Sequence, residues 1–317
     1  MPLLDEHSRG PLRTFRQPSP GGPVVFLVHP GALPVSAYQP LVRALPESVG
    51  VHVFDLMGLP GYREMLPDGR VRTSIEEIAR HCLTDLAALA PAGRTVLGGW
   101  SFGGVIAHAM AERLDSSGPL VLLDSTAPDA WPVRSDSWPV PAAAEHLPAG
   151  VRPAGCDSDD AVLLGWFAMY VGAARAVPCR IDARQFAGLG TEAALDGLRR
   201  LLVQRGVLHP DTTTAGLSRL YRAYLEGIAR NFHLTRGCPL RAGTRELTLV
   251  APEHRLSVAD PAGGWGPYAP AGLRIHHCPG DHYTMLAEPA AVRVIADAIE
   301  ERLAAPVTES VDGRARK

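Results

Sequence analysis

Short apolar runs alternate with amphipathic stretches along most of the chain. Six continuous apolar runs predict strands buried on both faces, as in a parallel sheet. They span residues 24–29, 50–55, 95–100, 119–124, 246–251 and 273–278. Apolar residues at helical spacing predict helices at 75–89, 102–114 and 291–303. This alternation predicts an α/β fold with a mostly parallel, doubly wound sheet.

The alternation stops between about residues 130 and 236. This stretch begins rich in proline and then shows only helical patterns, at 161–170, 181–186, 192–205 and 215–231. It directly follows a sheet strand, at the edge where open α/β sheets bind their ligands. We therefore expect a helical lid over that edge. A helical subdomain that only stabilises the fold is the alternative.

The predicted organisation has five segments. They are an irregular N-terminal arm (1–22), a first part of the α/β core (23–130), the helical lid insertion (131–236), a second part of the core (237–305) and a flexible tail (306–317).

Composition and charge exclude several classes of function. A formal net charge of −2 over 317 residues does not indicate a nucleic-acid or membrane-surface partner. No apolar run reaches the ~18 residues of a membrane span, and the N-terminus has no apolar block of a secretory signal. The five cysteines show no C-x-x-C spacing, so neither a disulfide framework nor a metal site is expected. A cytoplasmic location follows as the expectation.

The strongest chemical signal is Gly-Trp-Ser-Phe-Gly at residues 99–103, followed by Gly104. A G-x-S-x-G element between a strand and a helix is the nucleophile elbow of α/β-hydrolases. The serine lies on a strained turn that needs small neighbours, and the helix N-terminus points its N–H groups at developing negative charge. The pattern predicts an α/β-hydrolase fold with Ser101 as a nucleophile.

A serine hydroxyl needs a base to accept its proton, and His282 is the predicted base. It lies in a turn after the last predicted strand, which agrees with the order serine, acid, histidine along the chain of such enzymes. His276 and His277 lie on the strand itself, and His108 lies on the helix after the elbow.

The acid has three candidates. Asp124 ends the strand that follows the elbow helix, beside the strand of Ser101. Glu253 and Asp260 lie in the loop after the 246–251 run, where many α/β-hydrolases carry their acid. Asp124 is the preferred assignment, and the other two stay open.

Acyl transfer also needs hydrogen-bond donors for an oxyanion. The backbone N–H of Phe102, directly after the nucleophile, is one predicted donor. The second is expected from Gly31 or Ala32, in the loop after the first core strand.

Four segments together resemble the thioesterase domains that release products from polyketide synthases and nonribosomal peptide synthetases. They are HPGALPVSAYQPL after the first core strand, GGWSFGG at the elbow, LVLLDS at the acid and CPGDHYTML at the histidine. The resemblance covers roughly residues 22–305 and implies that Asp124 is the acid of the release type. It also implies Gly31 as an oxyanion donor. Residues 30–33 read Pro-Gly-Ala-Leu rather than the family's commoner P-x-G-G, which leaves Gly31 or Ala32 open.

The resemblance implies an acyl chain carried on the phosphopantetheine of an acyl or peptidyl carrier protein. Ser101 would take this chain and pass it to water or to an internal hydroxyl or amine, without a metal or other cofactor. A discrete editing thioesterase, a free-ester esterase or lipase, and a non-catalytic binding module are the alternatives. A lid over the acyl chain would be lined by apolar residues at helical spacing, for which the candidates are Leu164, Phe167, Ala168 and Val171. Packing within the lid is the other role open to them.

Overall fold

The computed structural model describes residues 10–64, 66, 71–114, 118–130, 157–186, 188–236, 238, 240–243, 245–256 and 260–305. Within these ranges a 7-stranded sheet has the order β1-β3-β2-β4-β5-β6-β7. The strands are β1 (Leu12–Arg16), β2 (Val24–His29), β3 (Gly50–Asp55), β4 (Thr95–Trp100), β5 (Leu120–Leu123), β6 (Leu247–His254) and β7 (Leu273–Asp281). All neighbouring strands run parallel except β1 and β3. The predicted mostly parallel α/β fold is confirmed.

Strand β1 is a correction to the predicted irregular arm. Residues 12–16 pair antiparallel with β3, with Leu12 opposite Phe54. The guanidinium of Arg16 fastens this edge strand by donating from Nε to the carbonyl oxygen of Val49, at 2.7 Å. Because proline and glycine flank these five residues, the sequence pattern predicts an irregular segment. The pairing with a distant strand leaves no local pattern that would predict the strand. Residues 1–9 of the arm lie outside the described residues.

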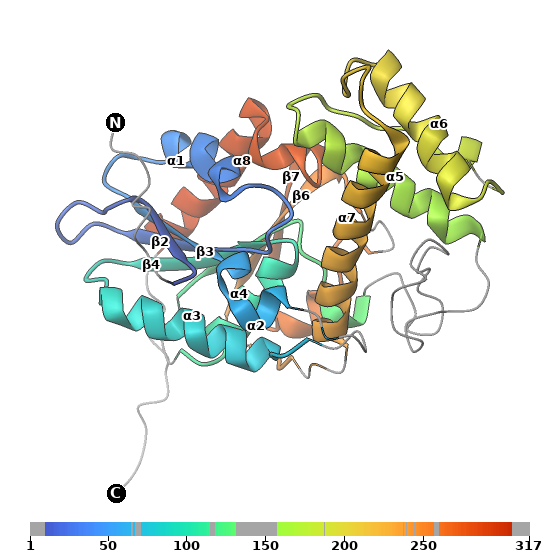
Figure 1. Cartoon of the computed structure of the whole chain (residues 1–317). Coiled ribbons are helices and arrows are strands. Elements are labelled where there is room, and N and C mark those ends of the chain that lie inside the picture. The colour runs from blue at the N-terminus through green and yellow to red at the C-terminus, as the bar shows by residue number, and fades with distance from the viewer. Residues whose placement is uncertain are drawn as a thin grey trace, which may run out of the picture.

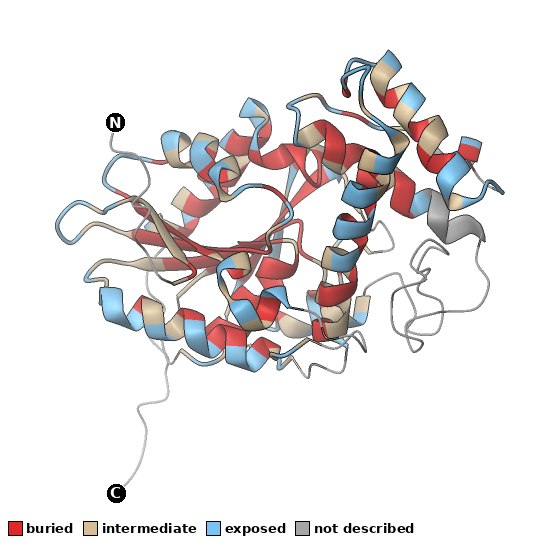
Figure 2. Ribbon diagram, viewed as in Figure 1, coloured by how far each residue is buried: buried red, intermediate tan, exposed pale blue. Residues whose placement is uncertain are grey.

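Helices cover both faces of the sheet (Figure 1). Helices α1 (Gln39–Ala44) and α8 (Pro289–Ala304) pack on one face, and α3 (Ile75–Leu89) and α4 (Phe102–Ala111) pack on the other. Successive side chains of a strand point to opposite faces. Val25 and Leu27 of β2 therefore join one buried cluster, and Val24 and Phe26 join the other. Figure 2 shows this burial running through the sheet and the inner sides of the helices.

The segment between β5 and β6 is helical in the part that the structure describes. It contains α5 (Asp157–Ala173), a 3₁₀ turn (Ala183–Phe186), α6 (Thr191–Gln204) and α7 (Thr214–Thr235). These helices lie together on one side of the molecule (Figure 1). The helix expected at 181–186 is only the 3₁₀ turn. Residues 131–156 of the predicted lid and the predicted tail at 306–317 lie outside the described residues, and the segment boundaries stay a prediction.

The remaining short elements connect the strands and helices. They are the helix α2 (Pro60–Arg63) and the 3₁₀ turns Val35–Tyr38, Leu56–Gly58, Pro128–Ala130, Gly266–Tyr268 and Thr284–Leu286.

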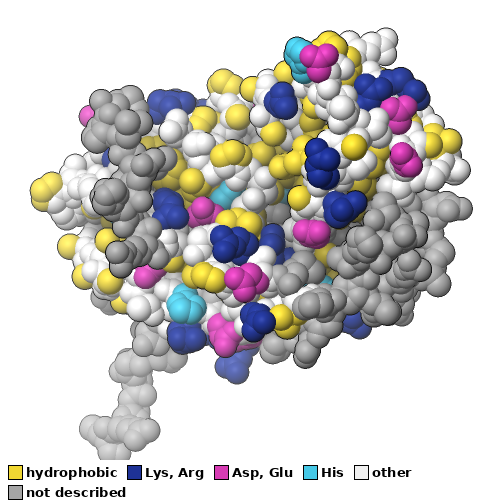
Figure 3. Space-filling view, viewed as in Figure 1, with side chains coloured by type: hydrophobic (Ala, Val, Ile, Leu, Met, Phe, Trp, Pro, Cys, Tyr) yellow, Lys and Arg dark blue, Asp and Glu magenta, His cyan; other side chains and the backbone are white. Residues whose placement is uncertain are grey.

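The surface and the helices agree with the compositional expectations. On the face seen in Figure 3, basic and acidic side chains are interspersed over the described part of the surface. None of the described helices combines the length and the hydropathy that a bilayer span requires. The expected cytoplasmic location stays a prediction.

Candidate active site

Ser101 occupies a strained turn between β4 and α4. Its backbone has φ +56° and ψ −127°, a region that residues with a side chain rarely adopt. A Cβ at Gly99 would overlap the backbone of Gly103, and a Cβ at Gly103 would overlap the carbonyl of Val28. The two glycines are therefore required by the close approach of helix and sheet. The elbow expected at Ser101 is present.

The turn places Ser101 at the N-terminus of α4, which begins at Phe102. First-turn N–H groups have no acceptor within their own helix, and the positive end of the helix dipole lies there. The backbone N–H of Ser101 itself donates to the carbonyl oxygen of Leu123 at 2.9 Å, which ties the elbow to β5. This arrangement suits the stabilisation of negative charge next to Ser101.

His282 and Asp124 form a buried pair at the same edge of the sheet. The distance from His282 Nδ1 to Asp124 Oδ2 is 2.7 Å, and the two side chains are only 4% and 3% exposed. Asp124 follows β5, and His282 follows β7. Because Nδ1 faces the carboxylate, Nε2 is the ring nitrogen left to exchange a proton with a hydroxyl.

Trp100 connects this pair to the nucleophile's strand. It precedes Ser101 directly, and its ring stacks on the imidazole of His282 with centroids 5.0 Å apart. Its indole Nε1 also donates to the carbonyl oxygen of His282 at 2.9 Å. The ring of Tyr283 meets the imidazole edge-on, at 4.9 Å and 90°. The base is thus fixed in orientation from two sides.

The loop after β2 turns at Gly31 in a backbone conformation that favours glycine, and the predicted role of Gly31 or Ala32 as an oxyanion donor stays a prediction. Gly31 has φ +89°, and a Cβ there would overlap the side chain of Met57. His29 closes the loop, since its Nε2 lies 2.6 Å from the carbonyl oxygen of Leu33. Burial lowers the pKa of His29, so the neutral ring donates this bond. Ala32 is exposed at the tip of the loop.

The other acid candidates lie away from the base. Asp260 accepts hydrogen bonds from the N–H groups of Ala262 at 2.9 Å and Gly264 at 2.7 Å, within its own loop. Glu253 is exposed and lies 4.0 Å from His254. Of the three candidate acids, Asp124 is the one that the structure brings to His282.

The other histidines also lie elsewhere. His276 is 3.8 Å from Glu301, and His277 is exposed. His108 is buried against the rings of Trp265 and Tyr268.

Arg255 is a neighbour of the pair that the sequence did not reveal. Its Nε lies 2.6 Å from Asp124 Oδ1, and its side chain is 8% exposed. Arg255 follows β6 and belongs to no motif, so a single sequence contains no signal for this contact. The carboxylate of Asp124 therefore has a cation on one oxygen and the imidazole on the other.

The four candidate lining residues of the lid are all buried: Leu164, Phe167, Ala168 and Val171. The ring of Phe167 packs against those of Tyr221 at 4.9 Å and Tyr224 at 5.4 Å. These side chains belong to the buried cluster that the lid shares with one face of the sheet. They contribute to packing, and their role in lining an acyl chamber stays a prediction.

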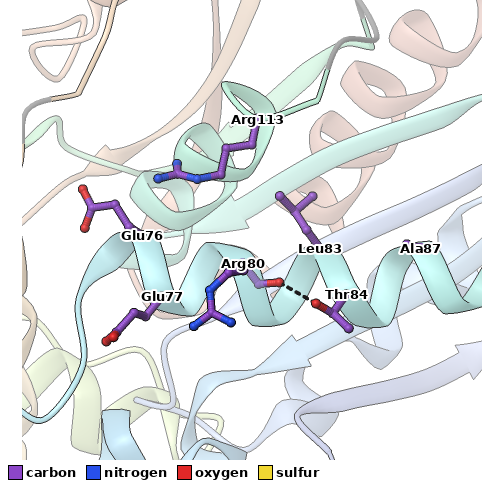
Figure 4. Close-up of a pocket in the computed structure, with 7 residues that line it drawn as sticks. All are labelled: Glu76, Glu77, Arg80, Leu83, Thr84, Ala87 and Arg113. Carbon is purple, nitrogen blue, oxygen red and sulfur yellow. Dashed lines mark hydrogen bonds between the residues drawn. The ribbon is translucent and has the colours of Figure 1, made fainter.

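A surface pocket of about 560 Å³ lies apart from Ser101, His282 and Asp124 (Figure 4). Its walls are residues of α3 together with Arg113, and they include none of the predicted catalytic residues. Within the ranges given above, no three His, Cys, Asp or Glu side chains are grouped closely enough to hold a metal ion.

Part of the chain matches a known protein family. Residues 23–146 match the family model of the thioesterase domain. This part of the chain is similar to a thioesterase domain. This confirms the predicted resemblance over the three motifs that the match spans, and the thioesterase domain family implies hydrolase activity, as expected.

Two relatives of the chain are large synthetases. The chain is 27% identical, over 94% of its length, to a probable nonribosomal peptide synthetase, CymA, of Salinispora arenicola. It is 33% identical, over 37% of its length, to malpibaldin synthetase of Mortierella alpina. The chain spans only 3% and 2% of the lengths of these two relatives.

Solved structures show the same fold. One neighbour is the NocB thioesterase domain in covalent complex with a fluorophosphonate nocardicin G analogue. It is 23% identical, with a TM-score of 0.54, and the match covers 92% of this chain and 99% of that one. A second is the four-domain nonribosomal peptide synthetase AB3403, at 23% identity and a TM-score of 0.57, with 94% of this chain and 20% of that one covered. The predicted α/β-hydrolase fold is confirmed.

Proposed function

We propose that this thioesterase domain releases an acyl or peptidyl chain from a carrier protein through an acyl–Ser101 intermediate. The observation that carries the proposal is the 2.7 Å contact between His282 Nδ1 and Asp124 Oδ2, held beside the elbow by Trp100. A nucleophile on a strained turn, a base and a buried acid are the parts that acyl transfer requires.

In the acylation step, Ser101 Oγ attacks the thioester carbonyl while its proton moves to Nε2 of His282. The new C–O bond leaves a tetrahedral oxyanion, which accepts hydrogen bonds from the N–H of Phe102 and of Gly31 or Ala32. Collapse of this intermediate breaks the C–S bond. The imidazolium returns its proton to the departing pantetheine sulfur, which leaves as a thiol.

In the second step an acceptor removes the acyl chain from Ser101. His282 takes a proton from water, or from a hydroxyl or amine of the chain itself, as that group attacks the ester carbonyl. The imidazolium then protonates Ser101 Oγ as the C–O bond to the serine breaks. Water gives the free acid, and an internal acceptor gives a ring. Asp124 holds the imidazole and stabilises its charged form in both steps.

The carrier-bound substrate is proposed from the relatives, which by their names are a nonribosomal peptide synthetase and a non-reducing polyketide synthase. The phosphopantetheine arm belongs to the carrier protein, so no resident cofactor is proposed for this chain. The position of the acid after β5 favours release over editing. We propose a cytoplasmic location for the reaction.

The proposal is tested with a fluorophosphonate probe and a series of acyl-pantetheine thioesters. We expect the probe to label Ser101, which mass spectrometry of the peptides would identify. We also expect the thioesters to be cleaved with release of the free thiol. Faster cleavage of simple oxygen esters than of thioesters would favour the esterase alternative. An unlabelled Ser101 with no turnover would favour a binding module.

A further inference from the structure

Arg255 directly follows β6, the strand that lies between the strands of the acid and the base. The order β5-β6-β7 places Asp124, Arg255 and His282 just beyond the carboxyl ends of three consecutive strands. The backbone of β6 contacts both neighbours, because the N–H of Asp124 donates to Val250 at 2.8 Å and the N–H of His282 donates to His254 at 3.1 Å. Arg255 therefore directly follows the strand whose backbone contacts both the acid and the base.

The two oxygens of Asp124 have different partners. Oδ1 accepts from Arg255 Nε at 2.6 Å, and Oδ2 faces His282 Nδ1 at 2.7 Å. A carboxylate bonded through one oxygen only can still rotate about its last side-chain torsion. With Arg255 on Oδ1, that rotation breaks a short charge-assisted hydrogen bond. Asp124 is also held at φ +38°, a conformation that needs support from its surroundings.

Arg255 is anchored on its other side. Its Nη1 donates to the carbonyl oxygen of Pro261 at 2.8 Å. The loop that carries Pro261 is closed by the carboxylate of Asp260, which accepts the N–H groups of Ala262 and Gly264. The guanidinium thus bridges a rigid turn and the acid, and Asp260 supports the turn rather than the base.

Burial gives this contact an electrostatic role as well. The side chains of Asp124 and Arg255 are 3% and 8% exposed, and a charge removed from water needs a partner. In the resting state of the proposed mechanism the imidazole is neutral, so Arg255 is the cation that compensates Asp124. Arg255 therefore balances the charge of the carboxylate and holds it in place before His282 accepts a proton.

We propose that Arg255 is a positioning residue, which holds Asp124 so that Oδ2 meets His282 Nδ1. The inference rests on the proposed function of Ser101, His282 and Asp124. Under it, the loop after β6 contributes a cation that orients the acid.

The test compares the rate of fluorophosphonate labelling in Arg255→Gln and Arg255→Lys with that of the wild-type chain. Glutamine removes the charge, and lysine keeps the charge but cannot bridge Asp124 and Pro261 with a planar fork. We expect glutamine to slow labelling at least ~10-fold, but less than the ~10⁴-fold loss that follows misorientation of a triad histidine. Lysine should give a rate between glutamine and wild type.

Two controls separate positioning from loss of folding. Arg302→Met removes another buried arginine, which bonds Thr248 and Glu246 near the start of β6, and it should label at the wild-type rate once folded. In proton NMR, the downfield resonance of the His282 Nδ1 proton should be sharp in the wild type and broadened or lost in Arg255→Gln. In an Asp124→Asn background, Arg255→Gln should cause no further loss of rate.

A wild-type labelling rate in either folded Arg255 variant overturns the proposal. If glutamine prevents folding, the lysine variant decides by the same criterion. Absence of Ser101 labelling in the wild-type chain would instead overturn the proposed function, so the two failures are distinguishable.

Discussion

The hydroxyl of Tyr224, on lid helix α7, lies 2.8 Å from the hydroxyl of Tyr283, the residue after His282. Both side chains are buried, and burial raises the pKa of each hydroxyl above its ordinary value, so both stay protonated. The ring of Tyr283 in turn contacts the imidazole. A buried hydrogen bond thus joins the lid to the residue that follows the predicted base.

Tyr224→Phe should destabilise the fold by about 1–3 kcal/mol, because it leaves the hydroxyl of Tyr283 buried without this partner. Removing both hydroxyls should cost less than the two single losses together. Urea unfolding of the single and double variants measures this coupling. Strictly additive costs would show that the two hydroxyls do not stabilise each other.

Ser101→Ala should abolish fluorophosphonate labelling and lower thioester turnover by about 10⁶-fold, as removal of a triad nucleophile does in other enzymes. Its melting temperature should stay close to that of the wild type, since the lost group is one small hydroxyl. Steady-state kinetics with an acyl-pantetheine thioester measures the loss. Near-normal turnover would exclude Ser101 as the nucleophile.

Asp124→Asn should lower turnover by about 10⁴-fold, because the histidine loses its orientation and the charge that stabilises the imidazolium. Glu253→Gln is the matched control, with the same chemical change on an exposed side chain, and should leave turnover unchanged. Asp260→Asn should lower stability more than turnover, since its carboxylate closes a turn. An inactive Asp260→Asn variant together with an active Asp124→Asn variant would show that Asp260, and not Asp124, is the catalytic acid.

The helical segment at 131–236 should set the preferred acyl chain length. Burial is worth about 0.8 kcal/mol per methylene, which is a factor of roughly 4 in kcat/KM for each methylene that the lid accommodates. Exchange of this segment for that of another thioesterase domain should change the chain-length profile and leave labelling of Ser101 intact. An unchanged profile would make the insertion a structural subdomain only.

His108 should make the stability of the fold depend on pH. Burial, with the nearby Arg245, lowers its pKa from 6.5 to about 4. The unfolded chain therefore binds the proton more readily. Between about pH 6.5 and pH 4 the unfolded chain is protonated while His108 in the fold stays neutral, so the free energy of unfolding decreases as pH falls through this window. The melting temperature should fall over this window, and His108→Gln should weaken the dependence. A steeper dependence in the variant would contradict this origin.

The sequence by itself determined the elements whose causes are local. The buried strands follow from continuous apolar runs. The elbow follows from five adjacent residues, because the close backbone contacts that require its glycines lie within the motif and with one neighbouring strand. The position of His282 after the last strand followed from chain order. These features need no knowledge of which distant side chains meet.

Only the tertiary structure decided which acid meets His282. Asp124 follows β5, Glu253 lies at the end of β6, and Asp260 lies in the loop after β6, so the sequence left all three open although it favoured Asp124. What separates them is the direction of each side chain, which depends on contacts across three strands. The same holds for Arg255, for the edge strand β1 and for the burial of the lid's apolar residues, because each depends on partners far along the chain that a local pattern does not specify.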